Sequence, residues 1–223
     1  MQKHFLKKIW LYIPTMRTFF LLFVVLFSAF AESCYVAGKV EIAEAERGLN
    51  CLQQGVLLVR LKTGSNQIKL LRLAGKNEEA DEIARFWETE NKAIVKAFLK
   101  EYRFGPVLFF YNTATDSVRT RQTRGIFLND SLQRLPDDLL GNRPYLIAEL
   151  DELDAPSSNF GLPALVVRDS SLKQLGRPFP YFTRMQFRNY KSGVFEFNKK
   201  LMDYSQRVKR KKEKQEAKKS PLQ

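Results

Sequence analysis

The sequence predicts a single α/β domain built on a central mixed or mostly parallel sheet of about five strands. The first observation is a set of short, continuous apolar runs rich in β-branched and aromatic residues, which is typical of strands buried on both faces. The four clearest runs are residues 56–59, 107–111, 145–148 and 162–167. The second observation is that helical spacing separates some of these runs, as in folds that alternate strands with helices. We expect this domain to span residues 55–208.

The chain begins with a segment that predicts export. Residues 19–31 form an apolar run that is shorter than the roughly 20 residues a helix needs to cross a bilayer. Lys and Arg precede this run without any acidic residue, and it ends in Ala29-Phe30-Ala31, whose small residues suit a leader peptidase. These features predict a cleaved signal peptide over residues 1–31 and therefore a periplasmic or extracellular protein.

Two alternatives remain for this first segment. A start at Met16 would itself give an ordinary signal peptide, because Arg17 supplies the positive charge before the apolar run. An uncleaved anchor would have to add residues 10–13 to reach across the membrane, and Pro14 and Arg17 interrupt that longer span.

The only two cysteines are Cys34 and Cys51, both in the segment 32–54 that precedes the domain. An oxidising compartment favours a disulfide between them. It would tie the mature N-terminus to the domain and stabilise it by about 3 kcal/mol in the chain-entropy model. Lipidation of Cys34 is the alternative, but Glu32 departs from the small or aliphatic residues that usually precede a lipidated cysteine.

The composition excludes several chemistries. The single histidine is His4, so the predicted mature chain lacks both histidine-based nucleophile systems and histidine metal ligands. The motifs C-x-x-C, G-x-x-x-x-G-K-[ST], G-x-G-x-x-G and G-x-S-x-G do not occur. We therefore expect no metal and no cofactor, and any catalysis would use carboxylates, Lys, Tyr or Ser.

The net charge indicates the class of partner. The chain carries a formal charge of +13, and four of its cations lie in residues 1–31, which leaves +9 for residues 32–223. More than half of that excess, +5, lies after residue 200. Nucleic acid is the usual partner of a basic chain, but predicted export argues against it. We expect instead an anionic lipid, a glycolipid or an acidic polymer of the cell envelope.

Between the first two predicted strands, residues 67–102 lack a strand pattern and predict a helical hairpin that crosses from one strand to the next. Leu70 and Leu73 belong to a short helical face that ends at Gly75. Asn77 then caps a second helix, and Glu78 and Glu79 in its first turn favour the positive end of the helix dipole.

The later part of the chain predicts smaller elements and a longer C-terminal helix. Residues 125–128 form a weaker fifth strand, and residues 131–140 and 170–175 predict short helices. An apolar seam with alternating three- and four-residue spacing marks the C-terminal helix: Val194, Phe197, Leu201, Tyr204 and Val208. Residues 209–223 cluster Lys and Arg with few apolar residues, so we expect a basic tail that leaves the core. Two roles remain open for it, peripheral contact with an anionic membrane and a solubilising tail without a partner.

An acidic group follows the predicted strand at residues 145–148. Its members are Glu149, Asp151, Glu152 and Asp154. Ligands of open α/β sheets bind outside the carboxyl ends of the strands, so the position suits a site. Paired carboxylates there would act as general acid and base, or hold a hard cation such as Ca²⁺. The alternative is a solvated loop ending at residues 156–158, because the spacing meets no metal-ligand pattern.

Two groups of arginines predict anion binding. Residues 181–188 alternate in polarity, with Arg184 and Arg188 on the outer face of a half-exposed strand. The second group lies in a loop and comprises Arg119, Arg121 and Arg124. Arginine suits phosphate and carboxylate partners because its N–H donors form a planar fork. The alternative for the strand is an edge that uses charge to avoid pairing with another chain.

Two functional hypotheses follow. The first is a non-catalytic, exported binding or accessory protein of the cell envelope that recognises an anionic partner through basic surfaces. The second is a carboxylate-dependent hydrolase with its site after the strand at residues 145–148. Convergence of two of those carboxylates in a pocket would favour the enzyme, whereas a splayed solvent loop would favour the binding protein.

Overall fold

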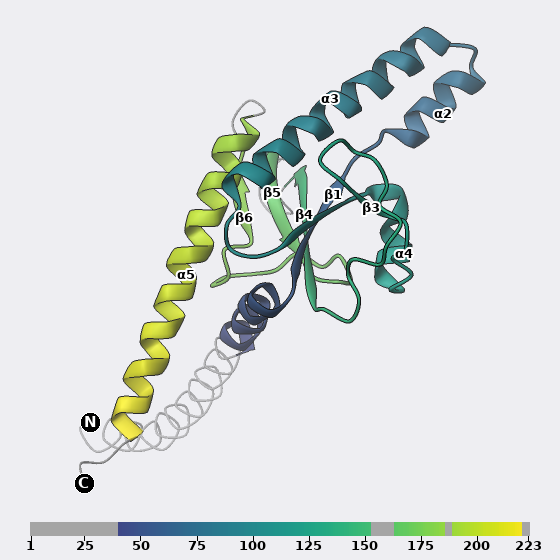
Figure 1. Cartoon of the computed structure of the whole chain (residues 1–223). Coiled ribbons are helices and arrows are strands. Elements are labelled where there is room, and N and C mark those ends of the chain that lie inside the picture. The colour runs from purple at the N-terminus through teal and green to yellow at the C-terminus, as the bar shows by residue number, and fades with distance from the viewer. Residues whose placement is uncertain (1–39, 153–162, 186–188, 220–223) are drawn as a thin grey trace, which may run out of the picture. The chain divides into compact units, whose positions relative to one another are not determined.

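The computed structural model describes residues 40–152, 163–185 and 189–219. They form an α/β domain around a six-stranded mixed sheet in the order β3-β2-β1-β4-β5-β6 (Figure 1). The strands are β1 (Val56–Leu61), β2 (Val107–Tyr111), β3 (Phe127–Leu128), β4 (Tyr145–Glu152), β5 (Pro163–Arg168) and β6 (Phe182–Arg184). The predicted fold class is confirmed, and the sixth strand comes from the half-exposed stretch that begins at residue 181.

The centre of the sheet is parallel. β1 pairs in parallel with β2 on one side and with β4 on the other, whereas β3, β5 and β6 run antiparallel to their neighbours. Pro106 and Pro144 stand immediately before β2 and β4, and their carbonyl groups accept hydrogen bonds of 3.0 Å from the backbone N–H groups of Leu57 and Val56. A proline fits there because the first position of a strand tolerates the missing N–H.

The helices largely follow the sequence prediction. They are α2 (Ser65–Leu73), α3 (Asn77–Glu101), the 3-10 turn η1 (Asn112–Ala114), α4 (Thr115–Arg119) and α5 (Tyr190–Lys219), and residues 40–54 are helical as well. α2 and α3 are the predicted hairpin between β1 and β2. The predicted cap at Asn77 is wrong, because Asn77 is the first helical residue of α3 and Lys76 occupies the N-cap position without a side-chain cap hydrogen bond. Helical residues 44–54 belong to the same compact unit as the sheet, which the sequence did not predict. No helix among the described residues has the length and apolar character needed to cross a bilayer.

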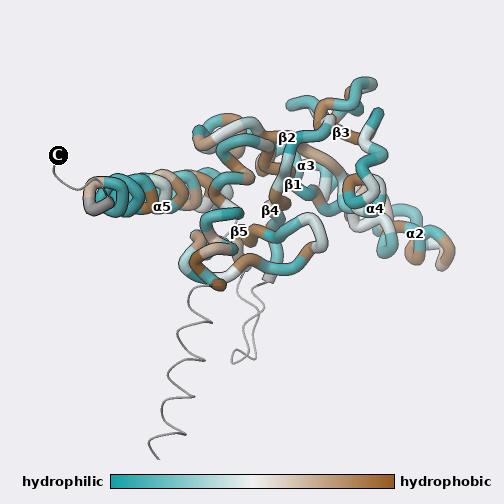
Figure 2. Tube along the Cα trace, turned by 90° about the horizontal axis from the view of Figure 1, so that it is seen from below, coloured by the Kyte–Doolittle hydropathy of each residue, from teal (hydrophilic) through white to brown (hydrophobic). Residues whose placement is uncertain are grey.

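One face of the sheet packs against helices. Phe98 of α3, Phe197 of α5 and Leu52 of the helix at residues 44–54 are fully buried in the same apolar cluster as Leu57 and Leu165. Burying these large side chains removes apolar surface from water and supplies most of the stabilisation of this layer. Figure 2 shows apolar residues concentrated along the central strands.

The other face of the sheet is covered without long helices. Val118 of α4 and Leu140 of the segment that joins β3 to β4 are buried against Leu58, Phe110 and Phe127. This second apolar cluster covers only part of the face. Arg60, two residues after Leu58, lies on the same face of β1 and is charged, so the apolar cluster ends there.

Two elements depart from the prediction. Residues 131–140 and 170–175 are turns and irregular chain rather than short helices. In the first, the Asn129 side chain accepts hydrogen bonds from the backbone N–H groups two and four residues further on, at 3.0 and 2.8 Å. Asp169 does the same at 2.8 and 2.9 Å. Such side-chain bonds satisfy backbone donors outside a helix, and they compete with helix formation.

These two turns belong to a repeated structural unit. In each, a strand leads into a five-residue turn, and a leucine four positions after the strand end adopts a left-handed conformation (Leu132 φ 62°, Leu172 φ 68°). Two residues after that leucine, the chain forms an antiparallel β-bridge with the last residue of the strand. We name residues 106–135, with β2 and β3, the first flank unit, and residues 144–175, with β4 and β5, the second flank unit. The two units lie on opposite sides of β1.

Candidate anion-binding surface

α5 changes character along its length. Phe197 and Leu201 are fully buried on the sheet, and Val208, half-buried, is the last contact with the core, as the apolar seam predicts. The next positions on that side are occupied by Lys211, Lys212 and Gln215, which cannot join an apolar cluster. From residue 209 to 217 every side chain is exposed, so the predicted basic tail is a helix through residue 219, and it leaves the core.

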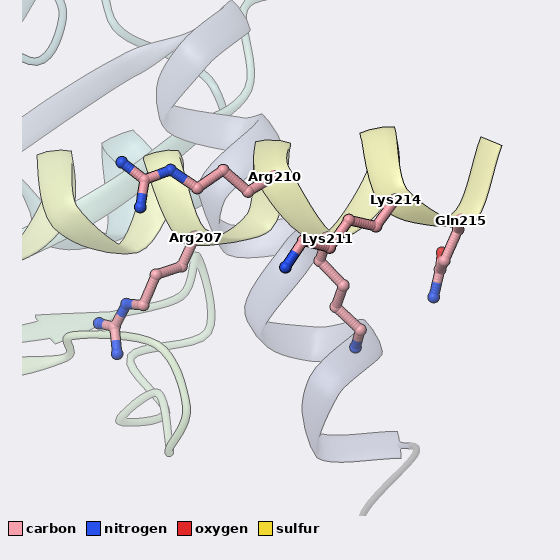
Figure 3. Close-up of a pocket in the computed structure, with 5 residues that line it drawn as sticks. All are labelled: Arg207, Arg210, Lys211, Lys214 and Gln215. Carbon is pink, nitrogen blue, oxygen red and sulfur yellow. The ribbon is translucent and has the colours of Figure 1, made fainter. Parts of the chain in front are cut away.

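A basic surface runs along this exposed half of α5. Arg207, Arg210, Lys211 and Lys214 line one shallow pocket together with Gln215 (Figure 3). We name these four cations the basic stripe. At about 100° per residue they fall on one side of the helix, and Glu213 and Glu216 fall toward the other. The stripe is therefore a surface of one sign of charge, although the whole segment also contains acidic residues.

The inner end of the basic stripe is oriented by its neighbours. The Arg207 guanidinium lies 5.9 Å from the centre of the Tyr204 ring, and its Nε donates a hydrogen bond of 3.3 Å to the carbonyl of Asp203. Within the described residues, none of the four cations forms an ion pair with a carboxylate. The stripe can therefore bind an external anion without first breaking an internal ion pair.

β4 extends to Glu152, so Glu149, Asp151 and Glu152 of the predicted acidic group lie within the strand, and their predicted position after a strand ending at residue 148 is wrong. Glu149 is 3% exposed, and its carboxylate accepts hydrogen bonds from Arg60 Nη1 at 2.6 Å and Arg168 Nε at 2.5 Å. Asp151 pairs with Lys62 Nζ at 3.2 Å and with Arg168 Nη2 at 3.3 Å. We name these five residues the ionic cluster. A buried carboxylate needs such compensation, because an unpaired charge in the interior is strongly unfavourable.

Within the described side chains, Glu149 and Asp151 are the members of the predicted acidic group that belong to the ionic cluster. Glu152 is the last residue of β4, and Asp154 lies outside the described residues. Since Glu149 and Asp151 are held by three cations, the arrangement resembles a structural network more than an acid and base pair. Among the described residues, no group of three or more His, Cys, Asp or Glu side chains is placed to hold a metal ion.

The cations of the ionic cluster were not predicted from the sequence. Arg60 precedes Glu149 by 89 residues, and Arg168 follows it by 19. The available signal was the polar alternation after the first apolar run, where Arg60 and Lys62 share a side of the chain. That alternation placed Arg60 of β1 and Lys62, just after the strand, on one side of the chain, but only the strand order places them beside β4.

The arginines predicted in the loop have different environments. Arg121 Nη1 donates to the backbone carbonyls of Gly141 and Arg143 at 3.1 and 3.3 Å, and its guanidinium lies 5.4 Å from the centre of the Tyr145 ring. Arg121 therefore holds two segments of the fold together. Arg119, at the end of α4, lies 3.8 Å from an Asp116 oxygen, and Arg124 is exposed.

The predicted basic strand is an edge strand. Its alternation is confirmed over the described part of the chain, since Thr183 and Met185 are buried and Arg184 is exposed. Lys200 Nζ donates to the Phe182 carbonyl at 3.2 Å and lies 5.5 Å from the centre of that ring. This hydrogen bond occupies a carbonyl group at the open edge of the sheet. It therefore supports the alternative in which charged residues keep the edge strand from pairing with another chain. Arg188 lies outside the described residues.

Cys51 is partly buried, and burial raises the pKa of its thiol to about 11, with nearby Arg121 acting in the opposite direction. The thiol is therefore protonated at neutral pH and is a poor nucleophile. Because Cys34 lies outside the described residues, the Cys34–Cys51 disulfide stays a prediction.

Comparison with protein-family models, curated proteins and solved structures gave no match for this chain. The geometry and charge of its own residues therefore indicate its function.

Proposed function

We propose that this chain is an exported, envelope-associated binding protein that recognises an anionic lipid surface through the basic stripe of α5. The observation that carries the proposal is the position of Arg207, Arg210, Lys211 and Lys214. These four cations share one side of a helix that has left the core, and no internal carboxylate neutralises them within the described residues. Export is the prediction from residues 1–31, and it makes the envelope the source of the anions.

The physics of the basic stripe fits surface adsorption. Each Lys or Arg close to an anionic membrane contributes about 1 kcal/mol, so four cations contribute about 4 kcal/mol before side-chain ordering is subtracted. The exposed part of α5 has no large apolar residue from Lys209 to Ala217. The helix would therefore rest on the headgroups rather than insert among the acyl chains. Screening over about 8 Å at physiological salt makes this attraction salt-sensitive.

The ionic cluster gives less support to the hydrolase hypothesis. Glu149 is buried and bound by two guanidinium groups, and Asp151 shares one of them. Such a carboxylate could exchange a proton with a substrate only after losing an ion pair. The binding function needs no such rearrangement.

The test measures co-sedimentation with vesicles containing anionic lipid and with vesicles of phosphatidylcholine alone. In the stripe variant, Arg207, Arg210, Lys211 and Lys214 are all replaced by Gln. The control variant removes the same amount of charge elsewhere by replacing four exposed cations with Gln: Lys69, Arg85, Lys173 and Lys199.

We expect the original protein and the control variant to bind anionic vesicles at low salt, and the stripe variant to bind at least about tenfold more weakly. No binding of the original protein to anionic vesicles at low salt, or equal binding to phosphatidylcholine vesicles, would overturn an anionic lipid surface as the partner. Equal losses in both variants would show a general effect of net charge and would overturn the assignment to the stripe.

A further inference from the structure

A second basic surface lies on α3, apart from the basic stripe in the sequence. A groove between the last turns of α3 and the turn after β3 is lined by Lys92, Val95, Lys96, Leu99, Lys100, Asp130 and Ser131. We name it the α3 groove. Most of its lining comes from one helix, and the turn that forms the other wall is the one fixed by the Asn129 side chain.

Three cations follow one another along the α3 groove. Lys92, Lys96 and Lys100 are spaced by four residues, which places successive side chains on one side of the helix about 6 Å apart. Lys92 is paired with Glu88 at 2.6 Å, one turn earlier. Lys96 and Lys100 form no ion pair within the described residues. The positive charge at the end of α3 is therefore available to a ligand.

The α3 groove also contains apolar surface. Leu99 is 45% exposed, and Val95 beside it is buried. A polyanion would use the lysines but gain nothing from Leu99, and a neutral lipid would use Leu99 but gain nothing from the lysines. Only a ligand with an anionic head and an apolar chain uses both features.

We propose that the α3 groove binds a single-chain anionic amphiphile. Lys96 and Lys100 hold its anionic headgroup, and its chain covers Leu99 above Val95. Asp130 on the opposite wall repels an anion, so the headgroup faces α3 rather than the turn. The proposal does not depend on the basic stripe, which lies on a different helix and provides no apolar contact.

The experiment is calorimetric titration of the purified protein with dodecyl phosphate, dodecanoate and the uncharged dodecyl maltoside, each below its micelle concentration. The first two probes distinguish a phosphate head from a carboxylate head, and the third tests whether charge is needed. Three variants accompany the original protein: Lys96→Gln with Lys100→Gln, Leu99→Ser, and a control with Lys69→Gln and Arg85→Gln. A fourth, truncated after Val208, lacks most of the basic stripe.

We expect saturable binding of at least one anionic probe with one molecule per chain. The paired lysine variant should lose at least about tenfold in affinity, since it removes charge-assisted hydrogen bonds. Leu99→Ser should also weaken binding of the anionic probe, whereas the control and truncated variants should keep the original affinity. All of the substituted positions are exposed, and thermal denaturation will verify that each variant is folded.

Three results would overturn the proposal. They are the absence of saturable binding of both anionic probes, equal affinity for dodecyl maltoside, and an unchanged affinity in the paired lysine variant. Loss of binding in the truncated variant alone would assign the amphiphile to α5 and would likewise overturn the α3 groove as its site.

Discussion

The two flank units have the same order of strand and turn, but they differ in their side chains on the face of the sheet away from α3 and α5. In the first unit, Phe110 and Phe127 lie opposite each other and are completely buried. At the corresponding level of the second unit, Glu149 lies beside Arg60, and Arg168 reaches it from β5. Arg60 of β1 therefore lies between the two kinds of interaction, because it pairs with Phe110 of β2 on one side and with Glu149 of β4 on the other.

This difference shows how the same strand arrangement can be stabilised by two kinds of interaction. The aromatic half gains stability by removing apolar surface from water, and it tolerates neighbours of similar size. The ionic half is favourable only while every charge keeps its partner, because removing one partner leaves an uncompensated charge in the interior. Single substitutions should therefore affect the two halves differently, and the following predictions run from the largest effect to the smallest.

The largest effect is expected at the ionic cluster. Glu149→Ala leaves Arg60 and Arg168 facing each other without their shared carboxylate and should lower the free energy of unfolding by about 3–5 kcal/mol. Urea denaturation will measure the loss. The matched control is Glu82→Ala, which removes an exposed carboxylate and should change stability by less than about 0.5 kcal/mol. A loss at Glu149 within the control range would mean that the cluster contributes little.

The second effect concerns the aromatic half. Phe110→Ala should destabilise the protein by about 3–4 kcal/mol, because it creates a cavity under the segment that carries Val118. The cost should be somewhat below that of Glu149→Ala, since an irregular covering segment can partly collapse into the space. Phe195→Ala, at a half-exposed position on α5, provides the comparison and should have a much smaller effect. Equal losses at both phenylalanines would contradict the assigned role of Phe110.

The third prediction compares the two turns. Asn129→Ala and Asp169→Ala each remove two side-chain hydrogen bonds to backbone N–H groups. We expect losses of about 1 kcal/mol for Asn129 and about 2 kcal/mol for Asp169, whose ionised carboxylate forms the stronger bonds. Thermal denaturation distinguishes them, with Ser170→Ala as the control at an exposed turn position. A larger loss of stability for Asn129→Ala than for Asp169→Ala would contradict the view that the two turns are held by the same kind of hydrogen bond.

The smallest effect on stability should come from the end of α5, beyond both flank units. Deletion of residues 209–223 removes no buried side chain among those described, so the melting temperature should remain nearly unchanged. The same deletion should abolish salt-sensitive binding to anionic vesicles if the basic stripe is the binding surface. A clear drop in melting temperature would show that the segment packs on the domain and would contradict its description as exposed.

Local patterns in the sequence were sufficient for much of the fold. The continuous apolar runs predicted β1, β2, β4 and β5 because strands covered on both faces need no polar alternation. The seam ending at Val208 predicted where α5 leaves the core, because helical spacing identifies the buried side of a helix. The short helices predicted at residues 131–140 and 170–175 were wrong, because Asn129 and Asp169 bind backbone N–H groups and turn the chain instead.

The sequence by itself determined the α/β class, the hairpin crossover and the basic character of the C-terminal segment, since each depends on composition or on spacing within a few residues. The tertiary structure decided the environment of Glu149, because Arg60 and Arg168 reach it only once β1, β4 and β5 lie side by side. It also decided that Arg121 holds the fold together, whereas Lys96, Leu99 and Lys100 line an open groove. The physical reason is that charge and hydrogen-bond partners are satisfied across the sheet and between layers, at distances along the chain that no local pattern can specify.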